Sequence, residues 1–175
     1  MTIPKRKTHQ VTSNSSAGSP AQVFAAQLLA ALAKAGIRNF FLAPGARSQA
    51  LAIAAGQLAD AGKIDLHVRL DERSLGFTAL GSALASGEPS VLITTSGTAV
   101  ANLHPAVLEA HHSGVPLILL TADRPHELRG VGANQTTNQI NIFNDAVREC
   151  VDVPAPNGND GEPREAVQLA MNAIS

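Results

Sequence analysis

The strongest constraint on the fold is a regular alternation of short apolar segments with segments of helical periodicity. Three of the apolar segments are almost continuously apolar and two alternate apolar with polar residues; in chain order the five are 39–43, 64–70, 90–95, 115–122 and 147–153. Nearly continuous apolar strands are typical of sheets covered on both faces, and no Asn-Gly or Asp-Gly dipeptide flanked by strands predicts a hairpin. The pattern therefore predicts parallel βαβ units with right-handed crossovers.

The segments between the predicted strands have apolar residues at helical spacing. Ser19 followed by Pro20 is typical of a helix N-cap with proline at the first helical position, and Gly36 would end that helix. Further helices are predicted at 47–60, from Asp71 to about 87, at 98–112 and at 164–174, with a short one at 140–145. We therefore expect an α/β fold with an open parallel sheet and helices on both faces. Strands 39–43, 90–95 and 115–122 are expected at central positions.

Composition excludes several classes of function. The chain has 175 residues, a net charge of −1, only 3% aromatic residues and neither Trp nor Tyr. An aromatic platform for nucleic acid and a general attraction to nucleic acid or membranes are therefore not expected. No apolar run reaches the length of a membrane span, and Lys5, Arg6 and Lys7 are not followed by an apolar segment, so we expect a cytoplasmic protein.

The polar first segment differs from the remainder of the chain. Residues 1–18 lack periodicity and predict a disordered arm, whereas 19–175 predict a single α/β domain. Cys150 lies in the predicted strand 147–153, where a buried structural thiol is favoured over a reactive one. His111 and His112 lack further ligands at zinc spacing, so a surface or helix-end role is expected and no metal site is predicted.

Polar residues gather where four of the predicted strands end. The stretches are Ala-Pro-Gly-Ala-Arg-Ser (43–48), Asp-Glu-Arg (71–73), Thr-Thr-Ser-Gly-Thr (94–98) and Thr-Ala-Asp-Arg-Pro (121–125). In a parallel sheet these ends meet at one edge, which is where open α/β sheets bind ligands. Arg47, Arg73 and Arg124 would suit carboxylate or phosphate groups there, because the guanidinium fork binds such groups bidentately. The alternative for each arginine taken alone is an exposed ion pair.

Two carboxylates, Asp71 and Glu72, stand where a strand passes into a helix. Asp71 is either the N-cap of that helix or part of a site, and Glu72 either favours the positive helix end or has a catalytic role. A simple anion binder has no use for Glu72, because its charge would repel the ligand. Dinucleotide-binding, Walker A and nucleophile-elbow motifs are absent from the sequence.

Five motifs in order resemble a known family. They are Ala-Pro-Gly-Ala-Arg-Ser, Asp-Glu-Arg-Ser-Leu-Gly-Phe, Thr-Ser-Gly-Thr-Ala-Val-Ala-Asn-Leu-His-Pro-Ala, Leu-Thr-Ala-Asp-Arg-Pro and Gly-Ala-Asn-Gln, within residues 20–153. Together they resemble the N-terminal pyrimidine-binding domain of the menaquinone-pathway 2-succinyl-5-enolpyruvyl-6-hydroxy-3-cyclohexene-1-carboxylate synthases, which are thiamine-diphosphate enzymes. The resemblance implies that domain's fold.

The resemblance also implies roles for single residues. Glu72 matches the glutamate that hydrogen-bonds N1′ of the cofactor's aminopyrimidine, and Ser96 and Gly97 match the turn beside that ring. The positions that match or adjoin the family's substrate contacts are Arg47, Ser48, Arg124, Asn134 and Gln135. Ala46 departs from the family, which usually has serine there. The lost hydroxyl contact, unless Ser48 replaces it, would cost about 0.5–1.5 kcal/mol.

The implied activity is that of a transferase that decarboxylates 2-oxoglutarate and adds the succinyl unit to isochorismate. The family requires thiamine diphosphate and Mg²⁺ or Mn²⁺, held by a second α/β domain, and places the cofactor between subunits of a dimer or tetramer. The resembled chains are several times longer, and no Gly-Asp-Gly metal motif occurs here. We therefore expect an N-terminal fragment that lacks the last strand of its sheet and is inactive alone. The alternatives are a non-catalytic carboxylate-binding module and another thiamine-diphosphate decarboxylase or carboligase, such as an acetolactate-synthase-like enzyme.

Overall fold

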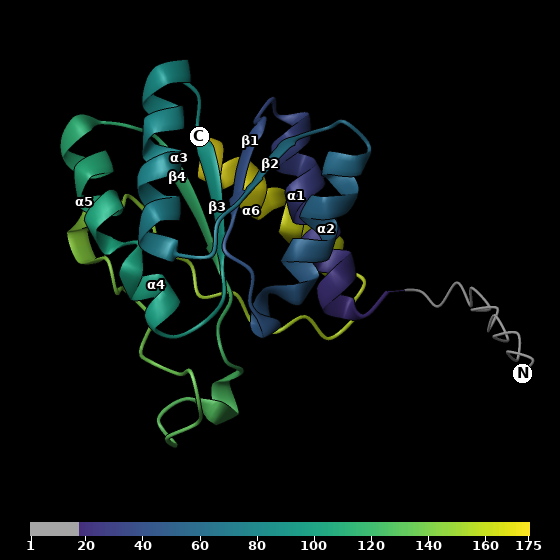
Figure 1. Ribbon diagram of the computed structural model, residues 1–175. Helices are drawn as coiled ribbons and strands as arrows, with labels where there is room; N and C mark the ends of the chain where they lie inside the picture. The colour runs from purple at the N-terminus through teal and green to yellow at the C-terminus, as the bar shows by residue number, and fades with distance from the viewer. Residues whose placement is uncertain (1–17) are drawn as a thin grey trace, which may run out of the picture.

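A four-stranded parallel sheet forms the centre of the molecule (Figure 1). The structure, a computed structural model, describes residues 18–175, so the predicted arm lies outside the described residues apart from Gly18. The strands are β1 (Asn39–Leu42), β2 (Asp65–Val68), β3 (Ser90–Thr94) and β4 (Leu117–Thr121), in the spatial order β2-β1-β3-β4. The predicted α/β class and parallel sheet are confirmed.

Helices cover both faces of the sheet. On one face lie α1 (Pro20–Lys34), α2 (Gln49–Asp60) and α6 (Glu162–Ile174), and on the other lie α3 (Glu72–Ser86), α4 (Thr98–Asn102) and α5 (His104–Ser113) (Figure 1). Within the part of the chain that the structure describes, none of these helices has the length and apolar character that crossing a membrane requires.

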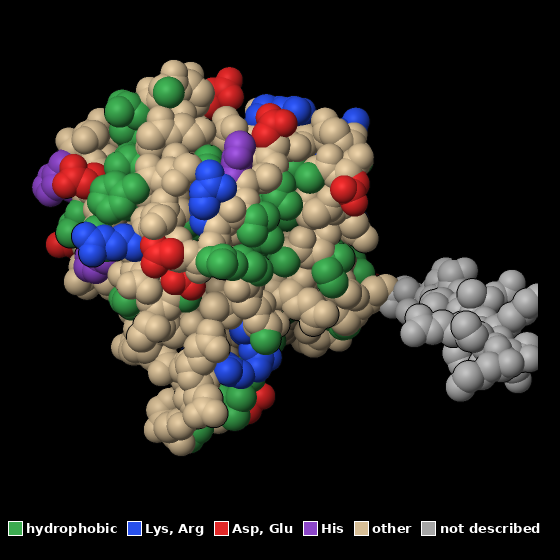
Figure 2. Space-filling view, in the orientation of Figure 1, with side chains coloured by type: hydrophobic (Ala, Val, Ile, Leu, Met, Phe, Trp, Pro, Cys, Tyr) green, Lys and Arg blue, Asp and Glu red, His purple; other side chains and the backbone are tan. Residues whose placement is uncertain are grey.

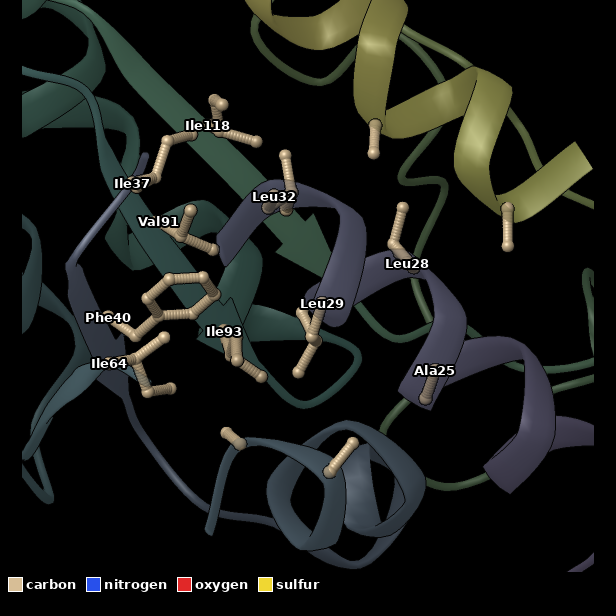
Figure 3. Packing of buried hydrophobic residues seen from close by; sticks show 14 of the residues in the cluster. Ala25, Leu28, Leu29, Leu32, Ile37, Phe40, Ile64, Val91, Ile93 and Ile118 are labelled. Atoms are coloured by element: carbon tan, nitrogen blue, oxygen red, sulfur yellow. The ribbon is translucent and has the colours of Figure 1, made fainter. Parts of the chain in front are cut away.

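Alternate strand residues supply the two cores. Phe40 of β1 and Val91 and Ile93 of β3 point toward α1, where they pack with Leu29 and Leu32 (Figure 3). The intervening residues Phe41 and Leu92 instead belong to the cluster under α3 and α5. Successive side chains of a strand point to opposite faces, so a nearly continuous apolar sequence supplies both cores at once.

The first helix begins as its sequence predicts. The Gln22 N–H donates to the Ser19 hydroxyl (3.4 Å), and the Ser19 N–H donates to the Gln22 side-chain oxygen (2.8 Å), which together form a capping box. Pro20 occupies the first helical position, and Gly36 follows the helix with a φ of +103°. Glycine adopts this left-handed backbone without the steric cost that a side chain would add.

The helix predicted at 98–112 is divided into two helices. α4 ends at Asn102, and α5 begins at His104 with Pro105 in its first turn. Proline has no N–H for the helical hydrogen bond, and its ring conflicts with the carbonyl four residues earlier. The prediction of one continuous helix is therefore wrong, because Pro105 is tolerated only at the start of a new helix.

The strand predicted at 147–153 is absent. This segment is extended at Val147, but it forms no ladder with the sheet and is largely exposed. Alternating polarity describes a half-buried strand only when a neighbouring strand supplies backbone partners, and this segment pairs with no strand among the described residues. Cys150, predicted to be buried there, is exposed, so that prediction is wrong for the same reason.

β4 lies at an end of the sheet, not at the predicted central position. Its apolar sequence follows from burial on its two faces: Ile118 and Leu120 contact the cluster around α1, and Leu117 and Leu119 contact the cluster around α5. A continuous apolar sequence therefore indicates that both faces of a strand are buried, but it does not indicate how many neighbouring strands pair with it.

Candidate functional site

The carboxyl ends of the four strands lie in register at one edge of the sheet. Backbone bonds continue the ladders there: the Ala43 N–H donates to Ile93, the Arg69 N–H to Leu42 and the Ala122 N–H to Thr94 (2.9–3.0 Å). The strand order reverses direction between β1 and β3, where α2 leaves toward one face and α4 toward the other. Such a switch point is where open α/β sheets bind ligands, as the sequence predicts for this edge.

A tight turn after β1 closes against the end of β3. It passes into a short 3₁₀ helix, η1 (Ala46–Ser48), and a Cβ built on Gly45 would lie 2.4 Å from the Cβ of Thr95. Ser48 is 1% exposed, and its hydroxyl bonds the N–H and the carbonyl of Gly45 (3.2 and 3.1 Å). The Ser48 hydroxyl therefore shapes the turn, whereas Ala46 and Arg47 are exposed.

We expect Gly45→Ala to destabilise the chain by about 1–3 kcal/mol in urea denaturation, because the clash is with Thr95 Cβ, which no rotamer change can move. Gly56→Ala is the matched control: the new methyl meets nothing within 4 Å in α2 and should stabilise by about 0.5–1 kcal/mol. Equal effects of the two substitutions would contradict the close approach.

Asp71 and Glu72 have different environments at the start of α3. Asp71 is the N-cap, and its Oδ1 accepts from the N–H and the hydroxyl of Ser74 (2.7 and 2.6 Å). Glu72, in the first turn, is half-buried, and its Oε2 accepts from the Asn102 amide of α4 at 3.4 Å. Oδ1 of Asp71 thus caps the helix, while one long contact holds the carboxylate of Glu72 among the described residues.

The cap predicts a pH dependence of stability. Hydrogen bonds from the Ser74 hydroxyl and then the Ser74 N–H hold the pKa of Asp71 below its usual value. A depressed folded-state pKa stabilises the fold above the unfolded value of about 4, and this contribution is lost as pH falls through the folded value.

Asp71→Asn keeps a capping side chain but does not titrate. We therefore expect the stability difference between wild type and Asp71→Asn, measured by denaturation, to be constant above about pH 5 and to shift toward the variant below about pH 4. Asp60→Asn at the end of α2 is the control, and a pH-independent difference for Asp71→Asn would contradict the cap.

The turn after β3 meets the long loop after β4. The Ser96 hydroxyl donates to the Gln135 carbonyl (2.9 Å), and the Gln135 side-chain amide donates to the Ser96 carbonyl (3.2 Å). Gly97 has a φ of +82°, and a Cβ on it would lie 3.0 Å from the Gln135 carbonyl oxygen. Both the backbone angle and the space require glycine at this position. The structure thus brings the predicted residues Ser96, Gly97 and Gln135 together.

Gln139 joins the ends of β3 and β4. Its side-chain oxygen accepts from the Gly97 N–H (2.8 Å), and its amide donates to the Ala122 carbonyl (3.0 Å). The residue is buried, so these bonds satisfy a side chain that would otherwise be costly to bury. Gln139 fixes the turn that contains Gly97 to the start of the loop that contains Arg124.

The three arginines of this edge differ in how they are held. Arg47 and Arg73 are exposed, whereas Arg124 is half-buried and its Nε has no partner among the described residues. Asn134 is exposed, and its carbonyl accepts from Thr136. Lys and Arg side chains gather where the loop after β4 meets the body of the molecule (Figure 2). The edge therefore carries Arg47, Arg73 and Arg124 on segments that follow three strand ends, and it is suited to an anionic ligand.

The structure adds three residues that sequence reasoning missed: Asn102, Arg129 and Gln139. Asn102 contacts Glu72, Gln139 contacts Gly97, and Arg129 contacts the carbonyl of Arg124. Each acts on a predicted residue from 5 to 42 positions away in the chain. No local pattern marks such partners, although Asn102 lies within one of the motifs that carry the resemblance.

Comparison with known proteins gives a family match over most of the chain. Residues 23–143 match the family model described as thiamine pyrophosphate enzyme, N-terminal TPP binding domain. Two similar relatives are named 2-succinyl-5-enolpyruvyl-6-hydroxy-3-cyclohexene-1-carboxylate synthase. The protein from Leifsonia xyli subsp. xyli is 55% identical over 157 residues, which are 90% of this chain and 26% of the relative. The protein from Kineococcus radiotolerans is 58% identical over 157 residues, which are 89% and 28%.

The chain thus spans about a quarter of the length of these curated relatives. The family match covers both crossovers of the switch point and every candidate residue from Arg47 to Gln135. On this match and the parallel sheet beneath it, the chain belongs to the family of thiamine pyrophosphate enzyme N-terminal TPP binding domains.

Proposed function

We propose that residues 19–175 form the pyrimidine-binding domain of a thiamine-diphosphate-dependent 2-succinyl-5-enolpyruvyl-6-hydroxy-3-cyclohexene-1-carboxylate synthase. In this proposal the complete enzyme decarboxylates 2-oxoglutarate and transfers the succinyl unit to isochorismate. The observation that carries it is the position of Glu72: a weakly held carboxylate in the first turn of α3, at the ligand-binding edge of the sheet. The names of the relatives support the choice of reaction.

The residues of the edge fit the aminopyrimidine end of the cofactor. Glu72 has one oxygen contacted by Asn102, which leaves the other free to hold a proton toward a ring nitrogen. The missing side chain of Gly97 lets Gln135 pack against this turn, since a Cβ there would lie 3.0 Å from the Gln135 carbonyl oxygen. Among the described residues no three Asp, Glu, His or Cys side chains gather to hold a metal ion. Mg²⁺ therefore does not fit this chain's own residues, and we assign it no step here.

When bound, thiamine diphosphate supplies the carbon nucleophile that accepts a 2-oxo acid and stabilises charge during decarboxylation. The contribution of this chain is acid–base and positional. Glu72 holds the proton that is shared with N1′ of the pyrimidine, which is the role of a general acid–base group. Arg47 and Arg124 bind and orient substrate carboxylates through charge-assisted hydrogen bonds. Asn134 and Gln135 are proposed to add polar contacts, with Ser96 and Gly97 beside the ring and Ser48 shaping the turn that carries Arg47.

A second subunit is proposed to cover Glu72. The outer side of α3 exposes Phe77 and Leu84, and the nearby end of β2 leads to Leu70, which is 88% exposed. Figure 2 shows hydrophobic patches across the face that α3 and α5 form. A diphosphate-binding domain of another subunit, seated on this surface in a homodimer or tetramer, would bury apolar area and exclude water from the carboxylate. A cytoplasmic location stays a prediction of the sequence.

A hybrid synthase tests the proposed function. In the hybrid, residues 20–174 of this chain replace the matching N-terminal part of the Leifsonia xyli synthase. The two sequences are 55% identical where aligned. We expect the hybrid, with thiamine diphosphate and Mg²⁺, to form the succinylated product from 2-oxoglutarate and isochorismate, and the 175-residue chain alone to form none. Binding of 2-oxoglutarate without turnover would favour a carboxylate-binding module. Carboligation of pyruvate in its place would favour another thiamine-diphosphate enzyme.

A further inference from the structure

Among the described residues, Arg129 makes more polar side-chain contacts than any other charged residue that the proposed function does not use. Its two terminal nitrogens bind both oxygens of Asp152 (2.7 and 2.9 Å), and one of them also lies 3.0 Å from Asp123. Its Nε donates to the carbonyl of Arg124 (3.1 Å). The Arg129 side chain is 21% exposed, against 47% for Arg38 in its ion pair with Asp65. The Asp152 side chain is 43% exposed, so the specificity of this pair comes from its bidentate geometry and from the covered Arg129 side chain.

These contacts fix the backbone on both sides of Arg124. The Arg124 N–H donates to Asp123 Oδ1 (2.6 Å), and Arg129 binds the other oxygen of the same carboxylate as well as the Arg124 carbonyl. The peptide groups before and after Arg124 are therefore both tied to Arg129, directly or through Asp123. The short 3₁₀ helix η2 (His126–Leu128) carries the chain from Arg124 back to Arg129.

The same contacts leave the charge of Arg124 available. Two carboxylates, Asp123 and Asp152, lie close to this loop, and Arg129 engages both. Among the described residues, the Nε of Arg124 is buried without a hydrogen-bond partner, and Arg124 forms no ion pair with Asp123 or any other carboxylate. Without Arg129, Asp123 would be an unpaired acidic neighbour that competes with any carboxylate ligand for Arg124.

Arg129 also attaches the segment 147–153 to the site. This segment has no ladder bonds to the sheet, so Asp152 provides a side-chain link between it and the loop after β4. The hydrogen bonds from Arg129 hold the pKa of Asp152 below its usual value, with smaller contributions from the charge of Arg129 and then that of His126. The interaction is thus between charged groups throughout the neutral pH range.

We propose that Arg129 is a positioning residue for Arg124: it holds the backbone around Arg124 and occupies Asp123 and Asp152, so that Arg124 is free to bind a substrate carboxylate. This inference rests on the proposed function, because the ligand of Arg124 is the carboxylate substrate of that reaction. Arg129 itself does not touch the substrate in this proposal. Its removal should therefore weaken substrate binding with little effect on the chemical step.

The test uses the hybrid synthase with Arg129→Ala, Arg129→Lys, Arg124→Ala and the double variant. We expect Arg129→Ala to raise the apparent KM for the same substrate that Arg124→Ala affects, by about tenfold, with kcat changed less than about threefold. Arg129→Lys keeps the charge but loses the fork, so its KM should lie nearer the alanine variant than wild type. In the double variant, loss of Arg129 should raise KM no further, because its effect passes through Arg124.

The control is Arg38→Ala, which removes a comparable arginine that binds the Gly62 and Lys63 carbonyls and pairs with Asp65, far from this edge. It should leave KM unchanged. Additive effects in the double variant, an unchanged KM for Arg129→Ala, or an equal KM rise for Arg38→Ala would each overturn the inference. If Arg129→Ala does not fold, Arg129→Lys and Asp152→Asn make the same comparison.

Failure of the proposed function is separable from failure of this inference. If the unmutated hybrid lacks carboligation, titration calorimetry with 2-oxoglutarate replaces KM in the same series of variants. If Arg129→Ala and Arg124→Ala each weaken the binding of 2-oxoglutarate, and the double variant binds no more weakly than Arg124→Ala, the positioning role is supported even though the proposed reaction has failed. Absence of both turnover and 2-oxoglutarate binding in the unmutated hybrid would overturn both proposals.

Discussion

Glu72→Gln in the hybrid synthase should lower kcat by about 10²- to 10⁴-fold, which is the usual range for removal of a positioned acid–base group. Glutamine keeps the shape of the side chain and can still meet the Asn102 amide, which lies 3.4 Å from Oε2. It cannot exchange a proton with a pyrimidine nitrogen. Binding of the cofactor should persist, so the loss should appear in kcat far more than in KM for 2-oxoglutarate.

Glu88→Gln is the control for this substitution. Glu88 is exposed just beyond the opposite end of α3, so the change in charge is the same while the distance from the edge is the length of the helix. Steady-state carboligation rates and cofactor titration of both variants provide the comparison. Retention of more than about a tenth of wild-type kcat by Glu72→Gln would remove Glu72 from the proposed acid–base role.

Arg124→Ala should raise the apparent KM for one carboxylate substrate by about 10- to 100-fold, since a hydrogen bond between charged groups contributes about 1.5–3 kcal/mol. Arg47→Ala should act in the same direction but less strongly. Arg47 is exposed and has no partner that fixes it among the described residues, whereas Arg124 is half-buried and its backbone is tied to Asp123 and Arg129. A flexible exposed side chain loses more conformational entropy on binding and so contributes less.

Measurement of KM for 2-oxoglutarate and for isochorismate separately will assign each arginine to a substrate. Arg73→Ala is a useful comparison, because Arg73 is exposed at the start of α3 and no substrate contact is assigned to it. Unchanged KM values for both substrates in Arg47→Ala and in Arg124→Ala would contradict substrate binding and favour the alternative role of these arginines in exposed ion pairs.

The class of fold and the order of its elements followed from local pattern. β1 and β3 are flanked by helices on both faces, and their continuous apolar sequences predict that arrangement. The caps of α1 and α3 depend on residues within one turn of the chain, Ser19 with Gln22 and Asp71 with Ser74, so the sequence contains all that is needed to predict them.

Features that depend on distant partners were not predicted. The segment 147–153 has the polarity of a strand, but a strand also requires a neighbour, and polarity does not specify one. The continuous apolar sequence of β4 predicts a central position, although the strand has a hydrogen-bonded neighbour on one side only. The break between α4 and α5 at Leu103 does not depend on a distant partner. Pro105 is a local signal for it, but the helical periodicity of 98–112 favours one continuous helix.

In the candidate site, too, the features that depend on local sequence are predictable and those that depend on distant partners are not. Glu72, Ser96, Gly97 and Arg124 follow strand ends, and parallel register brings strand ends to one edge, so their neighbourhood was predictable. The contacts of Arg129 with Asp152 and of Gln139 with Gly97 join segments 23 and 42 residues apart. They depend on the path of the loop after β4, which has no periodic pattern.

The position of β4 at the end of the sheet has a practical consequence for handling the chain. One side of this strand presents backbone N–H and C=O groups that no neighbouring strand pairs among the described residues, and Leu117–Thr121, apolar except for Thr121, include no charge to deter pairing. Such an edge is a template onto which a strand of a second molecule can add. Concentration-dependent self-association, visible in sedimentation velocity and slowed by a lysine placed on β4, is therefore the expected behaviour of the chain when it is purified by itself.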